Sequence, residues 1–271
     1  MFECVINLSE GRDAPLLDEL RATAGGSLRD LHADAFHNRS VFTLINDASQ
    51  LARDVRALLG AAFTSLDLTR HEGVHPRFGV VDVVPFVALE PEDPNEAVAL
   101  RDETAQWIAD SFNVPVFLYG PVDGAIRTLP EVRRMAFRTL KPDKGPESAH
   151  ATLGASAVGV RGLLVAWNLW LSGVTLNEAR AIARAIRSLE VRALAFQVGD
   201  QVQVSCNLVA PLLVGTSAVF DRVTSLLPAR GTVARAELVG LAPRALLAME
   251  DRTRWSQLDL SEQRTIEYQS G

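Results

Sequence analysis

Hydrophobic residues recur along this chain at two spacings, one typical of helices and the other typical of strands. Between residues 48 and 66, Leu51, Val55 and Leu58 fall on one face of a predicted helix, and Asp47 directly before it is expected to be the N-cap. The same reasoning predicts strands at 2–6, 27–35, 39–45, 78–87, 114–119, 163–171, 191–198, 202–208 and 233–239, and helices at 14–24, 48–66, 95–111, 129–140, 176–189, 217–227 and from 243.

The order of these elements predicts the fold. Residues 2–87 read as βαββαβ, and residues 163–239 repeat that order. Each repeat is expected to form an antiparallel sheet with helices on one face. We therefore predict an α+β protein of two ferredoxin-like βαββαβ subdomains, residues 1–163 and 164–271. The irregular stretch at 121–154 is rich in Gly, Pro and charge, and long connections of this kind are often functional.

Composition and charge restrict the class of protein. The net charge of −6 argues against a general nucleic-acid binder, because such proteins are normally basic. No apolar run approaches the roughly 20 residues that a membrane helix needs, and no signal-peptide pattern opens the chain. The only cysteines, Cys4 and Cys206, lie in apolar segments, so we expect buried, unreactive thiols. Together these features predict a cytoplasmic protein that binds neither membranes nor nucleic acid.

Candidate chemistry is concentrated in residues 70–86, RHEGVHPRFGVVDVVPF. Gly73 and Pro76 oppose a continuous helix, so this stretch is expected to be an ordered loop that leads into a strand. Loops held by a rigid strand often carry catalytic groups. His75 is a candidate general acid and base, because the pKa of an imidazole lies near neutrality.

The same stretch resembles a known family. HEGVHPRFGVVDVVPF is similar to the HxGxHPRMGAxDVxPF signature of glutamate formiminotransferases, and ECVINLSEGRD at 3–13 resembles their opening segment. Six further motifs follow in the family's order and extend the resemblance to about Met249: HNRSVFTL, VPVFLYG, PDKGP, GASAVGVRGLLVAWNLWL, VQVSCNL and ELVGLAPRALL. Each motif alone has little specificity, but their shared order is a strong signal.

The resemblance implies an activity. Members of the family transfer the formimino group of N-formimino-L-glutamate to N5 of tetrahydrofolate, giving 5-formiminotetrahydrofolate and L-glutamate in histidine breakdown. Tetrahydrofolate would be a cosubstrate, and the two subdomains would have a tunnel or cleft between them. Members are often dimeric, so a homodimer is one expectation.

The resemblance also assigns roles to residues. The family's catalytic histidine is the one in the HPR motif, here His75. Arg77 beside it is suited to hold a substrate carboxylate through its planar guanidinium. Asp82 lies in a predicted strand and should have a partner, either a backbone N–H, or His75 or the cationic amidine of the substrate. The complete set predicted to bind substrate is Arg77, Asp30, Asp82, His71, Arg39 and Arg161; for the last two, an ordinary surface or ion-paired arginine is an equal alternative.

Residues 145–154, GPESAHATLG, match the family's folate-binding segment by position. Gly145, Pro146, Ser148 and Gly154 have the residue types of the family, whereas Glu147, His150 and Thr152 do not. The folate contacts of these last three residues are therefore predicted from their position alone. The alternative is a flexible linker between the halves. The segment consists of Gly145, Pro146, Glu147, Ser148, Ala149, His150, Ala151, Thr152, Leu153 and Gly154.

Two observations leave alternatives open. His71 and His75 have the HxxxH spacing of a zinc site, but Gly73 and Pro76 break the helix that it requires and no third ligand is evident, so no metal is expected. Where many family members have aspartate, this chain has His32. The alternatives are therefore a related enzyme that acts on 5-formyltetrahydrofolate, or a non-catalytic folate-binding homologue.

Overall fold

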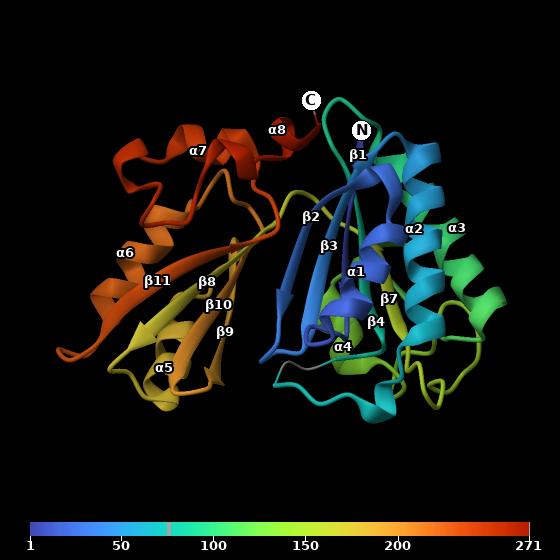
Figure 1. Cartoon of the computed structure of the whole chain (residues 1–271), viewed down its shortest axis with the longest axis horizontal. Helices are drawn as coiled ribbons and strands as arrows, with labels where there is room; N and C mark the ends of the chain where they lie inside the picture. Colours follow the sequence, from blue (N-terminus) through green and yellow to red (C-terminus); the bar gives the residue numbers. More distant parts are fainter. Residues whose placement is uncertain (75–76, 271) are drawn as a thin grey trace. The chain divides into compact units, whose positions relative to one another are not determined.

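The computed structural model describes residues 1–74 and 77–270, which divide into two compact units, Met1–Arg161 and Gly162–Gly271. Figure 1 shows the chain coloured by sequence. The helices and strands of the first unit are β1 (Phe2–Leu8), α1 (Ala14–Thr23), β2 (Leu28–Asp34), β3 (Arg39–Asn46), α2 (Ala48–Ser65), β4 (Val81–Ala88), α3 (Pro94–Phe112), β5 (Val116–Val122), β6 (Ala125–Arg127), α4 (Leu129–Met135) and β7 (Ser156–Val160). Those of the second unit are β8 (Val165–Ser172), α5 (Leu176–Ala185), β9 (Val191–Val198), β10 (Gln201–Leu208), α6 (Thr216–Leu226), β11 (Thr232–Val239), α7 (Arg244–Met249) and α8 (Ile266–Ser270).

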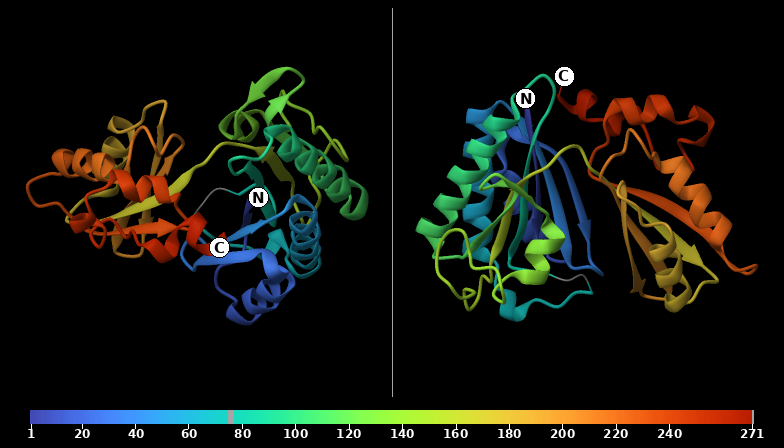
Figure 2. Two further views of the ribbon diagram at one scale, coloured as in Figure 1. Left: turned by 90° about the horizontal axis from the view of Figure 1, so that it is seen from above. Right: turned by 180° about the vertical axis from the view of Figure 1, so that it is seen from behind.

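The second unit has the predicted βαββαβ order. Its four strands pair antiparallel in the order β11-β8-β10-β9. Along β8, Trp167, Leu169 and Leu171 join the core formed with α5 and α6, which lie on one face of the sheet (Figure 2). Strands β9 and β10 form a hairpin whose turn includes Gly199, with φ of 61°, a conformation that glycine adopts without strain.

The first unit starts with the same order and then extends it. Its sheet has seven strands in the order β2-β3-β1-β4-β7-β5-β6. Cys4, Ile6 and Leu8 of β1 face the core against α1, α2 and α3, and Asp47 caps α2 by accepting from the Gln50 N–H at 2.9 Å, as predicted. The α+β class and the βαββαβ order predicted from the sequence are confirmed.

The prediction of a purely antiparallel sheet is wrong for the first unit. β7 pairs parallel with both β4 and β5, and neither β6 nor β7 was predicted. The sequence of β7, SAVGV, contains small residues of low strand propensity, so its pattern gives little signal before its neighbours are known.

Helix α4 lies on the face of this sheet that α1, α2 and α3 leave uncovered. Val132 of α4 packs with Phe117 and Ala157, which alternate along their strands with the residues of the main core. The helix ends at Met135 and not at 140 as predicted, because Phe137 takes a left-handed conformation with φ of 59°. This short helix therefore brings polar side chains to the second face of the sheet.

Among the described residues, no helix combines the length and apolar character needed to cross a bilayer.

The capping box of α5 gives a stability prediction. Thr175 Oγ1 accepts from the Glu178 N–H at 3.3 Å, and Glu178 Oε2 accepts from the Thr175 N–H at 2.8 Å. Thr175→Ala should lower the free energy of unfolding by about 1 kcal/mol, because it leaves a helix N–H without an acceptor. Urea denaturation followed by circular dichroism would measure this, with Thr175→Ser as the control. Equal midpoints for the two variants would contradict the capping role.

Burial of the thiols gives a second prediction. Both cysteines are buried, as expected, and burial raises the pKa of Cys206 to about 12. At about pH 8 the thiolate fraction is then on the order of 10⁻⁴, so Cys206 should resist alkylation in the native protein and react once urea unfolds it. Mass spectrometry after iodoacetamide treatment would measure this. Rapid modification of the native protein would show that the strand is more accessible than the structure indicates.

Candidate functional site

The loop between α2 and β4 carries the motif that the sequence singled out, and it packs backbone against backbone on the β2–β3 hairpin. A Cβ at Gly73 would lie 2.3 Å from the carbonyl oxygen of His37, so only glycine fits at this position. The predicted interruption of helix is therefore confirmed. His75, predicted as the catalytic residue, lies outside the described residues.

Asn38, at the tip of the β2–β3 hairpin, binds the start of this loop. It is buried and left-handed, with φ of 49°. Its side-chain Nδ2 donates to the carbonyl oxygen of Glu72 at 2.9 Å, and its Oδ1 accepts from the Gly11 N–H at 2.9 Å. Its own carbonyl oxygen accepts from His71 Nε2 at 2.7 Å, so Nε2 carries a proton. Asn38 thus joins three backbone segments.

Asp82, in β4, binds the end of the loop. Its side chain is 2% exposed. Oδ1 accepts from the Phe78 N–H at 2.6 Å, while Oδ2 accepts from Arg133 Nη2 of α4 at 2.5 Å and lies 3.9 Å from Arg39 Nη2. Of the partners considered for Asp82, the backbone N–H is present. The ion pair with Arg133 was not predicted.

Arg77 closes the loop on itself. Its Nη1 donates to the carbonyl oxygen of Gly73 at 3.3 Å, and its Nη2 donates to that of His71 at 3.1 Å. A guanidinium carries five N–H donors, so these two contacts are compatible with a further contact to a carboxylate.

These side chains meet in one pocket of the first unit. Four of the six residues predicted to bind substrate belong to it, although they come from two strands and a loop. The lining residues are Ser9, His37, Asn38, Arg39, His71, Arg77 and Asp82.

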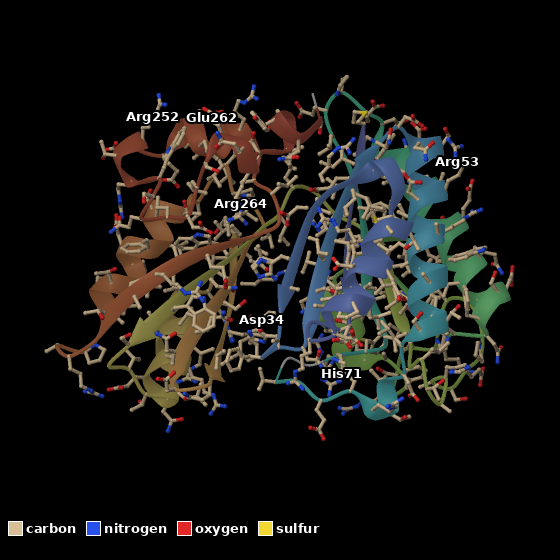
Figure 3. The ribbon with its side chains drawn as sticks, viewed as in Figure 1. Asp34, Arg53, His71, Arg252, Glu262 and Arg264 are labelled. Carbon is tan, nitrogen blue, oxygen red and sulfur yellow. The ribbon has the colours of Figure 1, made fainter. Side chains whose placement is uncertain are left out.

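The strand register extends this polar region along one face of the sheet. Asp30 stands opposite Thr43, His32 opposite Val41, and Asp34 opposite Arg39. Alternate residues of a strand share a face, so all three β2 side chains lie on the face that carries Arg39. The Asp30 Oδ2 atom is buried and has no hydrogen-bond partner among the described residues. Figure 3 labels Asp34 and His71 at the same end of this unit.

The electrostatics of the pocket favour an anionic ligand. Burial lowers the pKa of Arg39; the nearby Asp82 carboxylate opposes this shift and the Arg133 guanidinium adds to it. Two guanidinium groups therefore share one carboxylate, and Arg77 adds a further positive charge to the lining. A bound carboxylate would reduce this imbalance.

His71 is held neutral by its surroundings. Burial lowers its pKa, the hydrogen bond to Asn38 opposes the shift, and the positive charge of Arg77 adds to it. An imidazole whose hydrogen bond fixes one ring nitrogen suits a residue that orders the loop.

Arg161 is not part of this pocket lining. Its backbone N–H donates to the Phe86 carbonyl oxygen at 3.1 Å. Its positive charge partly offsets the effect of burial, which raises the pKa of Glu3.

The predicted folate-binding segment, residues 145–154, runs beside the same loop. The carbonyl oxygen of Thr152 accepts from the Leu68 N–H at 2.7 Å, and that of Leu153 accepts from the Val80 N–H at 3.0 Å. Gly154 has φ of 73° and packs against Gly79. Because β7 follows within the first unit, the segment does not link the two units, and the linker alternative is wrong.

The interior of this segment is held by contacts of its own. His150 Nδ1 accepts from the Leu153 N–H at 3.2 Å, and the backbones of His150 and Gly154 exchange hydrogen bonds at 2.9 Å. Glu147 is exposed and pairs with Lys141 at 2.8 Å. The other residues of the segment lie on or near the surface, apart from Leu153 and Gly154.

Several residues of the site were not predicted from the sequence: Ser9, His37 and Asn38 of the lining, and Arg133, which pairs with Asp82. Asn38 lies in a segment that was predicted only as a connection between strands, and Arg133 lies within a predicted helix. An asparagine between two strands is a signal for a left-handed turn position. Nothing in the sequence pairs Arg133 with Asp82, because the contact joins residues 51 positions apart.

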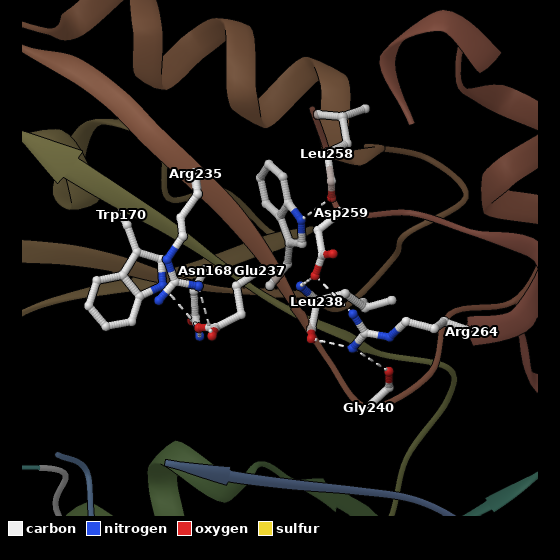
Figure 4. Close-up of polar contacts among 10 residues, drawn as sticks. Asn168, Trp170, Arg235, Glu237, Leu238, Gly240, Leu258, Asp259 and Arg264 are labelled. Atoms are coloured by element: carbon white, nitrogen blue, oxygen red, sulfur yellow. Dashed lines mark hydrogen bonds and ion pairs between the residues drawn. The ribbon is translucent and has the colours of Figure 1, made fainter. Parts of the chain in front are cut away.

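The second unit has a polar cluster on the sheet face opposite its helices (Figure 4). Glu237 Oε2 accepts from Asn168 Nδ2 and from Trp170 Nε1, both at 3.0 Å. The Arg235 guanidinium lies 4.2 Å from the centre of the Trp170 ring. These contacts explain how the interior of β8 accommodates Asn168, which belongs to the motif GASAVGVRGLLVAWNLWL.

Over the part of the chain that the structure describes, no cluster of His, Cys, Asp and Glu has the form of a metal site.

Comparison with known proteins identifies the family. Residues 1–161 match the model of the formiminotransferase domain, N-terminal subdomain. The chain is 34% identical to a glutamate formimidoyltransferase of Streptococcus pyogenes serotype M1, over 91% of this chain and 90% of that protein. It is 31% identical to a glutamate formimidoyltransferase of Thermoplasma acidophilum, with 91% and 89% coverage.

The bifunctional relatives are longer. The chain is 30% identical to a formimidoyltransferase-cyclodeaminase of Sus scrofa over 91% of its own length and 51% of that protein. The match to the N-terminal subdomain covers the unit that contains the pocket, and the relatives cover both units. The chain therefore belongs to the formiminotransferase domain family.

Proposed function

We propose that this protein is a glutamate formimidoyltransferase, which transfers the formimino group of N-formimino-L-glutamate to N5 of tetrahydrofolate. Support comes from its similarity to enzymes of that name over about nine-tenths of both chains. In keeping with the family, we assign it to histidine breakdown, and on its cysteine usage we assign it to the cytoplasm.

One structural observation carries the proposal: a single pocket gathers arginines, a neutral histidine and a buried carboxylate beside the HPR motif. Formiminoglutamate has two carboxylates and a cationic amidine. The guanidinium groups of Arg77 and Arg39 suit the carboxylates, because each offers paired N–H donors. The Asp30 carboxylate on the same sheet face suits the amidine.

The chemistry requires one proton to move twice. N5 of tetrahydrofolate attacks the formimino carbon, and a tetrahedral intermediate forms. In the proposed mechanism, His75 removes the proton from N5 and then delivers it to the departing glutamate nitrogen as the carbon–nitrogen bond breaks. Tetrahydrofolate is thus a cosubstrate, and residues 145–154 are proposed to cover it.

The first test is turnover. Wild-type protein should convert formiminoglutamate and tetrahydrofolate, and His75→Ala should lower kcat by roughly 10²- to 10⁴-fold, because proton transfer loses its catalyst. A spectrophotometric assay of 5-formiminotetrahydrofolate would measure this. Val74→Ala is the control, since Val74 is its 50% exposed neighbour in the same loop. Full activity in His75→Ala would remove the proposed mechanism.

The second test concerns the donor. Formiminoglutamate with tetrahydrofolate should be turned over, whereas 5-formyltetrahydrofolate with glutamate should not, because the Asp30 carboxylate favours a cationic amidine over a neutral formyl group. Both pairs would be assayed under the same conditions. Turnover of only the formyl pair would retain the pocket and change the substrate. If calorimetry shows tetrahydrofolate binding without any turnover, the protein is a non-catalytic binder.

A further inference from the structure

The loop of residues 71–78 is held at both ends by buried polar contacts that come from elsewhere in the fold. Asn38 of the β2–β3 hairpin binds its start, and Arg133 of α4 binds its end through Asp82. Both contacts are long-range, with sequence separations of 34 and 51 residues. The described ends of the loop, residues 71–74 and 77–78, are thus tied to remote parts of the fold.

The contact at the start depends on the side-chain chemistry of asparagine. Its amide donates to Glu72 and accepts from Gly11 at the same time, and aspartate could perform only the second function. The position also requires a left-handed backbone, which asparagine, aspartate and glycine tolerate best. Asparagine therefore suits position 38 for two reasons: it tolerates the left-handed backbone, and its amide both donates and accepts a hydrogen bond.

The contact at the end depends on charge. The Phe78 N–H is fixed by a carboxylate that is 2% exposed, and a buried carboxylate is stable only when it is paired. Arg133 provides that pair at 2.5 Å. Without the Arg133 guanidinium, the nearest arginine described beside Asp82 is Arg39, whose Nη2 lies 3.9 Å from Asp82 Oδ2. The end of the loop therefore depends on a helix that is remote in sequence.

We propose that Asn38 and Arg133 are positioning residues that hold the two described ends of the motif loop, residues 71–74 and 77–78, for formimino transfer. This inference rests on the proposed function. Neither side chain needs to touch substrate: they hold the parts of the loop that carry His71 and Arg77, and Arg77 is the residue proposed to bind a substrate carboxylate. Small misplacements of reacting groups cost as much as 10²-fold in rate.

The test compares kcat and KM in two variants. Asn38→Gly keeps the left-handed backbone and removes the amide, and Arg133→Gln removes the charge. Each should lower kcat by roughly 10- to 100-fold, with KM for both substrates changing less than about threefold, because positioning affects the reaction more than binding.

Matched controls separate positioning from stability. Asn113→Gly makes the same exchange at another left-handed position, with φ of 52°. Arg264→Gln removes an arginine whose partner Asp259 also accepts a backbone N–H, that of Leu238, at 2.7 Å (Figure 4). Both controls should keep the wild-type kcat, even where they lower the melting temperature.

A double variant and hydrogen exchange complete the design. If both residues act through one loop, Asn38→Gly with Arg133→Gln should lose less activity than the product of the single losses. The Gly11 amide should exchange faster in Asn38→Gly, because its acceptor is gone. If both single variants keep the wild-type kcat, this inference is wrong and the proposed function still stands. No turnover by the wild-type protein would overturn the proposed function and this inference with it.

Discussion

The candidate site depends on the pairing of one buried carboxylate. Asp82 lies on a strand of the central sheet, where an unpaired charge would be strongly unfavourable. Its two oxygens are used by two different parts of the fold: the Phe78 N–H at the end of the motif loop and the Arg133 guanidinium of α4. The placement of the loop is thus coupled to a helix that the βαββαβ pattern alone does not contain.

That helix is available because the first unit extends its sheet. β7 pairs with β4 and β5, and this widening extends the sheet face on which α4 packs, with Val132 against Phe117 of β5. In the second unit the sheet stops at four strands. The unit with the extension is also the one that carries the pocket.

Much of the site follows from residues that are close in sequence. His71, Arg77 and Asp82 lie within one motif. The sequence predicts that the segment before Asp82 is a loop, because Gly73 and Pro76 oppose a continuous helix. Arg39 could be named from its motif, but its place beside Asp82 required the register of β3 against β1 and of β1 against β4. Asn38 and Arg133 required the whole tertiary fold, because hydrogen bonding between remote residues leaves no local pattern.

The sequence by itself determined the two βαββαβ runs, the α+β class, the Asp47 cap and the segment that carries the candidate chemistry, since these depend on local propensity and periodicity. The tertiary structure decided the rest. It added β6 and β7, ended α4 at Met135, moved Arg161 out of the pocket lining and placed residues 145–154 against the motif loop. These features depend on pairing and burial between remote segments, which are determined only when the chain is folded.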